Sequence, residues 1–596
     1  MKKKILSIMP FLLFTAAMVN AQEATNYRGA FAPAPVTQWT DIWTNWDPQN
    51  AFYPAPSVTI SGVIGTQTWT KNNTYLLQGI VFVDSLATLT IEAGTVIRGD
   101  ANTVISTLVI QRGATILANG TPCNPIVFTS SKAIGSRVKG DWGGVTILGR
   151  GLNNLGTDVP IEGIGTSNPR GRFGGTNNAD NSGSLKYVRI EYAGFAISPG
   201  NELNSLTFGA VGSGTTVDYV QTSFGNDDAF EWFGGAVNCK HLVAYKTLDD
   251  DFDTDNGYSG LVQYGLGIKD PAISDDPSVS TSEGFESDNN GSTPFTLIPK
   301  TSASFYNITQ IGAFRCTSNL PSVTQPTAIA FRRGARLRRN TELKIFSSIL
   351  MNNFRGLVMD ADVLANGLAA FKNNIIAMDT SFISTVTGAT GKALFAENTA
   401  TSTYLTVAAN GNTLIPTPCN VLVNAWDFLN PDYRPNIAAG GGLSGCDLTP
   451  GLNLEASSIA DLAPKELVVD IFENGVGNSN GTVTVTITVP SSFAFSVPGI
   501  TTLSATPQSG TNGTSSTLGI SYTNGDWLFT LVGSSLRATS KPGIEVQPGG
   551  QVSLGYTFKR NTGVPTNTRA NLSVGVSGGS DTNASNNGTI AGLIAL

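Results

Sequence analysis

The sequence predicts an all-β protein, a right-handed parallel β-helix followed by an immunoglobulin-like β-sandwich. Gly occupies 66 of 596 positions, and only 13% of the residues are charged. Short segments of Thr, Val and Ile lie between Asn, Gly and Ser, a composition that favours strands joined by turns. A repeated segment in the first part of the chain and a strictly alternating segment near its end predict the two architectures.

The clearest repeat aligns residues 89–97 with residues 108–116 at a shift of nineteen. Each copy has a short strand, a Gly at the turn and a second short strand. A unit of this length cannot bury its apolar face alone, so copies must stack as the coils of a solenoid. We expect the β-helix to span residues 61–438, preceded by an N-terminal extension or cap at residues 22–60.

The first 21 residues have the features of a cleaved secretory signal. Three lysines precede an apolar stretch from Ile5 to Met18, and small residues follow it. The apolar stretch is shorter than the ~18 residues of a membrane-spanning helix. We therefore expect a secreted protein, extracellular or at the cell surface, with the periplasm as an alternative. The net charge of -7 gives no reason to expect a nucleic-acid partner.

The end of the chain predicts a second domain. Residues 439–466 are small and polar and are interpreted as a linker. Residues 481–489 alternate strictly, as in a half-buried strand. Regular strand and turn spacing over residues 467–596 predicts the immunoglobulin-like sandwich, and this part resembles the repeat modules of bacterial surface proteins that act as spacers. Further strands are predicted at residues 517–522, 527–532, 551–558 and 570–576.

Five cysteines are scattered along the chain without a Cys-x-x-Cys pair, which argues against a zinc cluster. Cys419 and Cys446 have two interpretations. They close a loop in an oxidising compartment, or they are small buried apolar residues of the β coils.

Acidic residues are strongly segregated. Between Asp227 and Asp288 there are fourteen acids and three bases, and five arginines follow within residues 332–339. Residues 226–228 recur as residues 249–251, a shift of one solenoid coil. Adjacent coils lie ~4.8 Å apart, so their carboxylates can share a hard cation, and calcium suits oxygen ligands best. The predicted ligands are Asp227, Asp228, Glu231, Asp249, Asp251, Asp253 and Asp255.

The last four of these ligands alternate in sequence, so an extended segment would place them all on one face. Asp251 to Gly257 looks like a calcium loop, but its Gly comes one place late for an EF-hand and Val262 occupies the twelfth position. A standard EF-hand is excluded, whereas an irregular site is not.

An alternative interpretation needs no metal. The acids would accept hydrogen bonds from turn amides or pair with the arginines a few coils away. The alternating arginines are equally consistent with a solvated face. The arginines concerned are Arg332, Arg333, Arg336, Arg338 and Arg339.

A glycan is the predicted partner, with a cell-surface component as the broader class. Trp232 and Tyr258 lie beside the densest acids and are candidates for stacking on a sugar ring. Arg332 and Arg336 are candidates for its acidic groups. Core filling is the commoner fate of such aromatic residues.

Four motifs, at residues 119–130, 140–144, 187–194 and 226–235, resemble a family of secreted, largely uncharacterised bacterial β-helix proteins. Their architecture is similar to that of pectate-lyase-like solenoids. The resemblance extends roughly from Tyr27 to Pro435 and implies the solenoid fold. It implies no particular activity.

Two functions follow. The favoured one is a noncatalytic cell-surface or matrix protein that binds calcium and a glycan. The alternative is a polysaccharide lyase or glycoside hydrolase acting on an acidic glycan, with an arginine as base or two carboxylates as acid and base. An arginine is a poor base unless its pKa is greatly lowered. The one histidine, His241, is expected to be structural, and no catalytic residue is assigned.

Overall fold

The computed structural model confirms an all-β protein built around a large parallel β-helix. The predicted signal segment, Cys316 and Cys446 lie outside the described residues. The structure describes residues 22–595 except for residues 24, 26, 34–35, 104, 199–200, 279, 315–329, 380–393, 417, 426–430, 437–447, 456–457, 460–461, 474–478, 480, 519, 547–550, 567 and 580–587.

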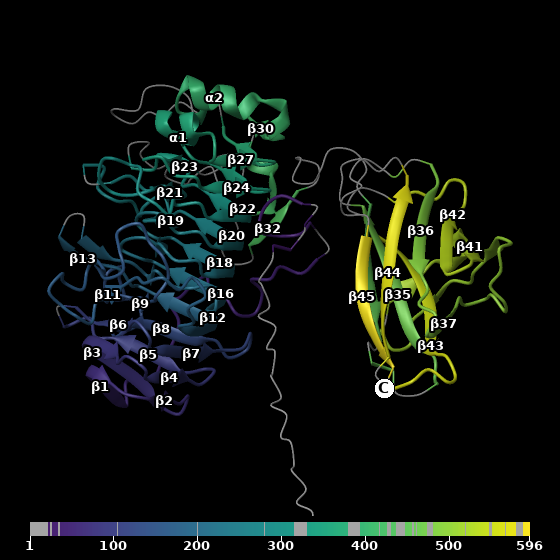
Figure 1. The fold of residues 1–596 in the computed structure, drawn as a ribbon, viewed down its shortest axis with the longest axis horizontal. Helices are drawn as coiled ribbons and strands as arrows, with labels where there is room; N and C mark the ends of the chain where they lie inside the picture. Colours follow the sequence, from purple (N-terminus) through teal and green to yellow (C-terminus); the bar gives the residue numbers. More distant parts are fainter. Residues whose placement is uncertain are drawn as a thin grey trace, which may run out of the picture.

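Twenty-six strands are hydrogen-bonded into one winding sheet. The full coils place strands in three stacks of parallel strands, here called stacks 1, 2 and 3, and several long strands bend from stack 2 into stack 3. In Figure 1 the coils succeed one another from β1 at one end to the helices α1 (Ala361–Asn366) and α2 (Thr399–Thr406) at the other.

Stack 1 carries the acidic strands of the sequence. It contains the second halves of β1 (Val58–Ile64) and β3 (Thr74–Val83), then β6 (Thr107–Ile110), β9 (Val145–Leu148), β15 (Leu206–Gly209), β17 (Phe230–Phe233), β19 (Phe252–Asp255), β21 (Phe285–Ser287), β23 (Arg333–Leu337), β26 (Arg355–Met359) and β29 (Leu394–Ala396).

Stack 2 contains the beginnings of the long strands that bend into stack 3. It contains β2 (Gln67–Trp69), β4 (Thr88–Ile91), β7 (Thr115–Asn119), the first halves of β12 (Gly183–Glu191), β16 (Thr216–Ser223), β18 (Asn238–Tyr245), β20 (Leu261–Ile268) and β22 (Ser304–Ile311), and then β24 (Lys344–Phe346) and β27 (Ala370–Lys372).

Stack 3 contains the second halves of the strands that begin in stack 2. The strands β1 and β3 instead begin in stack 3 and continue into stack 1. In full, stack 3 contains the first halves of β1 and β3, then β5 (Val96–Gly99), β8 (Ile126–Ser130), the second halves of β12, β16, β18, β20 and β22, and finally β25 (Ile349–Met351), β28 (Ile375–Ala377) and β30 (Thr413–Ile415).

The repeat that predicts the solenoid does not correspond to one coil. Gly94 and Gly113 do form the expected turns, with φ of 84° and 88°. However, Leu89 in β4 pairs with Ile116 in β7, whereas Leu108 lies in β6 of another stack. The shift of nineteen therefore aligns strands from neighbouring faces of the solenoid, because each full coil contains more than one strand–Gly–strand unit.

The corner between stacks 2 and 3 is lined by rings in left-handed backbone conformation. Tyr187, Tyr219, His241 and Tyr264 all have φ between 50° and 63°. Bulky residues rarely adopt this conformation, and here their rings stack with centroids 4.1–5.0 Å apart. His241 Nδ1 lies 2.7 Å from Asp218 Oδ1, a contact consistent with the predicted structural role of the histidine.

The N-terminal extension runs along the side of the solenoid and covers this corner. The ring of Trp39 lies 5.1 Å from His241, and the ring of Trp43 lies 5.9 Å from Tyr219. Gly29 donates a backbone hydrogen bond to Ser347, several coils further on. The described part of residues 22–60 thus ties together coils that are distant in sequence.

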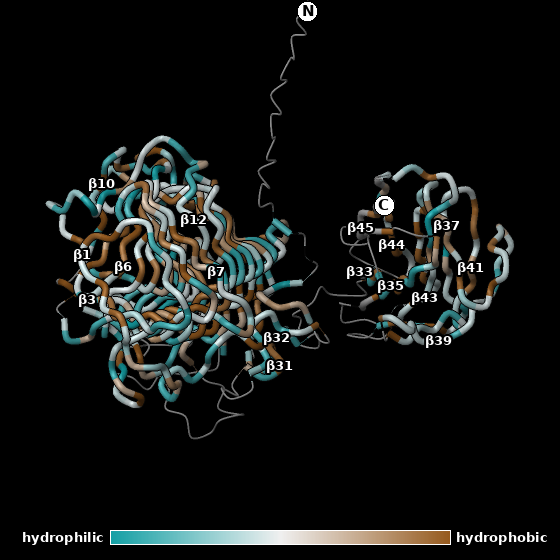
Figure 2. Tube along the Cα trace, turned by 90° about the horizontal axis from the view of Figure 1, so that it is seen from below, coloured by the Kyte–Doolittle hydropathy of each residue, from teal (hydrophilic) through white to brown (hydrophobic). Residues whose placement is uncertain are grey.

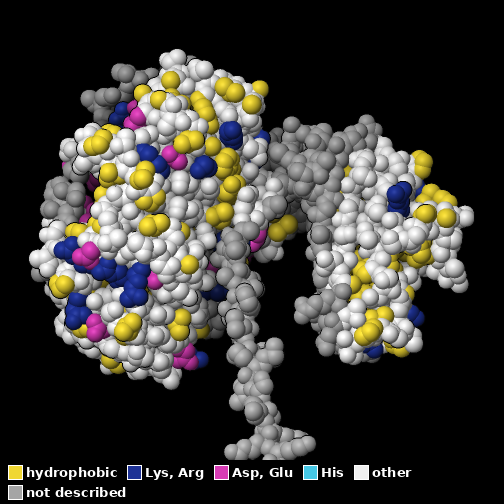
Figure 3. Space-filling view, viewed as in Figure 1, with side chains coloured by type: hydrophobic (Ala, Val, Ile, Leu, Met, Phe, Trp, Pro, Cys, Tyr) yellow, Lys and Arg dark blue, Asp and Glu magenta, His cyan; other side chains and the backbone are white. Residues whose placement is uncertain are grey.

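Apolar side chains fill the inside of the coils. One cluster of buried residues extends from Ile64 to Leu405 and includes members from all three stacks. Figure 2 shows apolar positions recurring from coil to coil. On the face drawn in Figure 3, charged side chains are sparse. Dense charge on this protein is therefore a local feature that needs its own explanation.

The C-terminal part contains two mainly antiparallel sheets that contribute to one apolar core, with Val469 and Tyr556 from one sheet and Val485 and Trp527 from the other. The sheets are β33 (Leu448–Leu454), β35 (Lys465–Glu473), β43 (Gln551–Arg560) and β37 (Phe493–Ser496), and β34 (Ser458–Ile459), β45 (Gly588–Ala595), β44 (Thr568–Gly578), β36 (Val483–Thr488), β42 (Ser535–Ser540), β41 (Trp527–Val532) and β38 (Gln508–Ser509).

Two sequence-based predictions for this part of the chain differ from the structure. Strand β33 lies within the segment predicted as a linker, because it pairs along its length with β35. Of the strand predicted at residues 517–522, only β40 (Ser521–Tyr522) forms. The remaining small elements are β10 (Val159–Pro160), β11 (Arg172–Phe173), β13 (Phe195–Ser198), β14 (Asn201–Leu203), β31 (Leu422–Asn424), β32 (Asp432–Pro435), β39 (Gly513–Thr514) and the 3-10 helices Ala408–Asn410, Pro418–Asn420 and Asn524–Asp526.

The cysteines divide into two groups. Cys419 is disulfide-bonded. Cys123 and Cys239 are free, the first exposed and the second buried. The pairing of Cys419 with Cys446 stays a prediction.

The covering of the ring-lined corner leads to a stability prediction. Trp43 is 1% exposed, so Trp43→Ala should remove its packing on Tyr187 and Tyr219 and cost about 3–5 kcal/mol of unfolding free energy. Phe52, which is 77% exposed, is the control, and Phe52→Ala should cost less than about 0.5 kcal/mol. Urea unfolding followed by tryptophan fluorescence measures both, and equal costs would contradict the assigned packing.

Candidate acidic cation site

Parallel pairing in stack 1 arranges the acidic side chains in a column. Glu231 in β17 pairs in register with Asp253 in β19, and Asp253 pairs with Glu286 in β21. The next partner is Arg336 in β23. The shift between the first two coils is 22 residues, not the 23 expected from the Asn-Asp-Asp repeat. Asp228 accordingly lies one coil from Asp250, whose backbone N–H donates to it.

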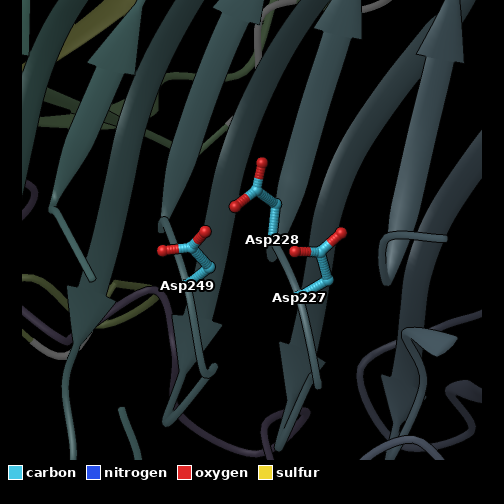
Figure 4. Close-up of side chains that lie close together, drawn as sticks. All are labelled: Asp227, Asp228 and Asp249. Carbon is cyan, nitrogen blue, oxygen red and sulfur yellow. The ribbon is translucent and has the colours of Figure 1, made fainter. Parts of the chain in front are cut away.

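Three carboxylates converge at the start of these strands. Asp227 and Asp228 precede β17, and Asp249 precedes β19 on the adjacent coil, with their carboxylates gathered together in Figure 4. One oxygen from each lies within 4.8 Å of the others. This set is called the outer group. Asp228, Glu231 and Asp253 meet the same criterion and are called the inner group.

Asp227 and Asp249 of the outer group line a cavity of about 420 Å³. Half of its lining residues are acidic, and Lys139 is the one base among them. Its other walls come from loops that the sequence analysis did not connect with the site. The cavity is lined by Lys139, Glu202, Asn226, Asp227, Leu248, Asp249, Ser274, Asp275, Asp276 and Ser280.

Electrostatics disfavour charge on the free carboxylates. Burial and then the neighbouring Asp249 raise the pKa of Asp227 well above its usual value. The pKa of Asp249 is raised by burial and by Asp275, although Lys269 acts in the opposite direction. Burial and Asp227 likewise raise the pKa of Asp228. The folded protein therefore needs protons or a cation at this position.

Two oxygens of the site lack hydrogen-bond donors. Oδ1 of Asp249 and Oδ1 of Asp253 are buried and accept no hydrogen bond from any described residue. A buried carboxylate oxygen without a partner is costly, whereas a bound cation would satisfy it. An all-oxygen set of closely spaced carboxylates suits a hard divalent ion such as calcium.

The acids in the later coils form ion pairs with arginines, as one interpretation of the sequence predicted. Arg336 lies 3.1 Å from Glu286, and Arg338 and Arg339 lie 2.6 Å and 2.7 Å from Asp288. Arg333 pairs with Glu283 at 2.6 Å. The alternative without metal thus holds for Glu283, Glu286 and Asp288.

These pairs bear on the arginine base of the lyase hypothesis. Burial lowers the pKa of Arg338, but Glu286 and Asp288 outweigh it and raise the pKa above the usual value. The same balance, through Glu283 and Glu397, raises the pKa of Arg333. Both arginines hold their protons more firmly than a free side chain, so neither is suited to remove a proton.

Two predicted ligands are placed elsewhere. Asp251 does not lie on the face of Asp253, because residues 246–251 form a turn and the strand begins only at Phe252. Its carboxylate is fully buried, 3.2 Å from Lys269 Nζ. Asp255 shares the face of Asp253 but belongs to neither group, and it accepts a hydrogen bond from the backbone of Asn256.

The aromatic candidates are corrected by the structure. Trp232 and Tyr258 are completely buried, with stacked rings 5.4 Å apart in the core of the solenoid. Trp232 alternates with Glu231 along β17, so it faces inward when the acid faces outward. Neither ring can stack on a sugar.

The two arginine candidates are accessible but engaged. Arg332 pairs with Glu397 and its side chain remains 46% exposed. Arg336 pairs with Glu286. Contact of either side chain with a glycan stays a prediction.

Several residues of the site come from distant segments and were missed. Glu162 is in a loop after β10. Glu202 lies in β14, and Asn204 directly follows that strand. The Asn204 amide donates to Glu231 Oε2. Apolar residues such as Ile161 and Phe173 hold this covering segment against stack 1. Nothing in the local sequence around Glu162 indicates that its loop folds back over β17.

These features define a β-helix protein with an acidic site on the side of one strand stack. The chain belongs to the pectate-lyase-like β-helix domain family, whose model matches residues 62–422. No curated protein matches the chain. None of the helices in the described part of the chain has the length and hydropathy that a membrane crossing requires.

Solved structures show weak likenesses. The major pilin subunit BcpA of Bacillus cereus is 12% identical, covering 24% of this chain and 39% of the pilin, with a TM-score of 0.16. The Dettilon tailspike protein is 8% identical over 83% and 88%, with a TM-score of 0.22. Tailspike protein 2 of Escherichia coli O157:H7 bacteriophage CAB120 is 10% identical over 87% and 64%, with a TM-score of 0.19. This chain thus spans about two fifths of the pilin, and TM-scores this low establish no common function.

The buried acids predict how stability depends on pH without metal. Burial raises the pKa of Glu162 from 4.5 to about 7 and that of Asp255 from 3.8 to about 8. At a pH between the unfolded-state pKa and the folded-state pKa of such a group, the folded protein keeps a proton that the unfolded chain has lost. This stabilisation is complete below about pH 4 and disappears as pH rises through 7 to 8.

The melting temperature in EDTA should therefore fall between pH 5 and pH 9. Calcium should reduce the fall, because a cation bound by the neighbouring carboxylates favours the ionised form of the titrating groups. Asp255→Asn should flatten the EDTA profile by removing one of the titrating groups. Differential scanning calorimetry tests this, and a profile in EDTA that rises over this range would contradict the assignment.

Proposed function

We propose that this chain is a secreted, noncatalytic cell-surface or extracellular-matrix protein that binds calcium and, through it, an acidic glycan. The observation that carries the proposal is the outer group, three converging carboxylates from two coils, of which Asp227 and Asp249 line one cavity. Arginine pairing relieves the later acids of stack 1, whereas no ion pair between described residues involves Asp227, Asp228 or Asp249.

Calcium coordination explains how a glycan would be held. Calcium takes six to eight oxygen ligands, so three carboxylates leave positions for water and for a carboxylate of the ligand. A cavity lined by acids would repel an acidic sugar without the cation, and calcium reverses the local charge. Arg332, further along the same stack and partly exposed, adds a second contact for an acidic group.

The C-terminal part is proposed to be an immunoglobulin-like spacer. Its two antiparallel sheets with a common core support this architecture. Since β33 begins at Leu448, the linker is proposed to be confined to the residues between the β-helix and that strand. Export through the segment 1–21 is supported by the disulfide at Cys419, since disulfides persist in oxidising compartments.

A lyase is the second candidate, favoured by the family and by Lys139. This lysine lines the same cavity as Asp227 and Asp249, and its Nζ donates to Asn226 Oδ1 at 2.7 Å. Burial lowers its pKa, although Asp275 acts against this. A lysine next to bound calcium is a chemically reasonable base for removing the proton beside a sugar carboxylate.

Calcium binding should stabilise the protein measurably. At a calcium concentration 100 times the dissociation constant, the gain is about 2.7 kcal/mol, seen as a higher melting temperature than in EDTA. Asp249→Asn removes an outer ligand and should abolish most of the gain. Asp255 lies on the same strand as Asp253 but belongs to neither group, so Asp255→Asn should retain the gain in stability. Identical melting temperatures in EDTA and millimolar calcium would sink the proposal.

The choice between binding and cleavage follows from one assay. Acidic and neutral polysaccharides are incubated with residues 22–596 and calcium, and their molar mass is followed by size-exclusion light scattering. The binding function predicts calcium-dependent complex formation with unchanged polymer mass. A lyase predicts falling mass and an unsaturated product that absorbs ultraviolet light, lost in Lys139→Ala and retained in the exposed control Lys71→Ala.

A further inference from the structure

We infer that the acidic site holds two divalent cations, with Asp228 as the ligand that they share. The second ion lies in the inner group, between Glu231 and Asp253. This inference deepens the proposed function and rests on it. It assigns the inner carboxylates to a separate ion that does not face the glycan.

The geometry gives each ion its own ligands. The outer group has Asp227 and Asp249 for itself, the inner group has Glu231 and Asp253, and Asp228 belongs to both. Because Glu231 and Asp253 are direct partners in adjacent parallel strands, their carboxylates face the same side one coil apart. Ions bridged by one carboxylate lie about 4 Å apart, slightly less than the ~4.8 Å between adjacent coils.

Asn204 points independently to a ligand in the inner group. This side chain is 1% exposed, and its amide nitrogen contacts Glu231 Oε2. Its Oδ1 is buried and accepts no hydrogen bond from any described residue. An unsatisfied buried carbonyl oxygen costs about 1–3 kcal/mol, and amide oxygens are good calcium ligands. Asn204 precedes β15, so the inner ion would join three consecutive coils.

Charge balance also favours two ions. The five carboxylates of the two groups carry five negative charges when ionised, and one calcium leaves three of them in a buried environment. A second calcium leaves one, and the ammonium group of Lys269 is already paired with Asp251. Repulsion between the two ions is screened by the bridging carboxylate, which is the arrangement found in two-metal sites.

The two positions differ in access. Asp227 and Asp249 line the cavity, whereas Glu231 and Asp253 do not. Asp228 and Glu231 are 6% and 7% exposed, and Glu162 lies next to Glu231. The inner ion is therefore the slowly exchanging one, which fixes Asp228 in place. The outer ion exchanges through the cavity and meets the glycan.

Metal stoichiometry tests the inference. Residues 22–596 are stripped with a chelator, dialysed against calcium, and analysed by mass spectrometry of the metal. Wild type should hold two ions per chain, Glu231→Gln one, Asp249→Asn one, and the control Asp255→Asn two. Asn204→Asp, which keeps an oxygen ligand, should also hold two.

The outcomes separate the two proposals. One ion in wild type that survives Glu231→Gln and is lost in Asp249→Asn overturns the second site and leaves the proposed function standing. No ion in wild type overturns both. Terbium luminescence of wild type keeps the test valid if Glu231→Gln does not fold. Two classes with different numbers of bound waters are expected, and a single class overturns the inference.

Discussion

In-register parallel pairing is the constraint on which the rest of the molecule depends. Each position of one coil lies directly above the same position of the next, so any repeated side chain becomes a column. On β17, β19 and β21 the inward position gives stacked Phe230, Phe252 and Phe285, with ring centroids 6.0 Å and 5.1 Å apart. The neighbouring outward position gives Glu231, Asp253 and Glu286. The register that stabilises the core therefore also concentrates like charge outside it.

A column of like charge must be relieved from outside the column. At its later end the following strand supplies arginines in the same register, and Arg336 meets Glu286 directly. At its earlier end the preceding strand, β15, supplies uncharged Thr207 and no base. Lys139 and Lys269 come only from turns and adjacent stacks. This asymmetry makes the coils around Asp228 the part of the solenoid where the acids need protons or a cation.

Features that depend on a short stretch of sequence are predicted correctly. Gly94 and Gly113 mark turns of a solenoid, and the clustered acids mark the site. Sequence reasoning misplaces Asp251 and Trp232 because alternation identifies a face only when the first residue of the strand is known, and β19 begins at Phe252. Glu162 and Asn204 escape it for another reason. They reach Glu231 through loops whose path is decided by apolar packing on stack 1, which no short motif records.

The same cation connects the two candidate functions. In the metal-free cavity the acids around Lys139 stabilise its ammonium form, which opposes the effect of burial on its pKa. Under the proposed function, calcium would cancel part of that negative field and would draw electrons from a sugar carboxylate. Occupancy of the outer group would then favour glycan binding and would also favour the neutral form of the lysine. The two proposed functions would then differ in how a bound sugar presents its acidic proton to Nζ of Lys139, because the electrostatic conditions that they require are the same.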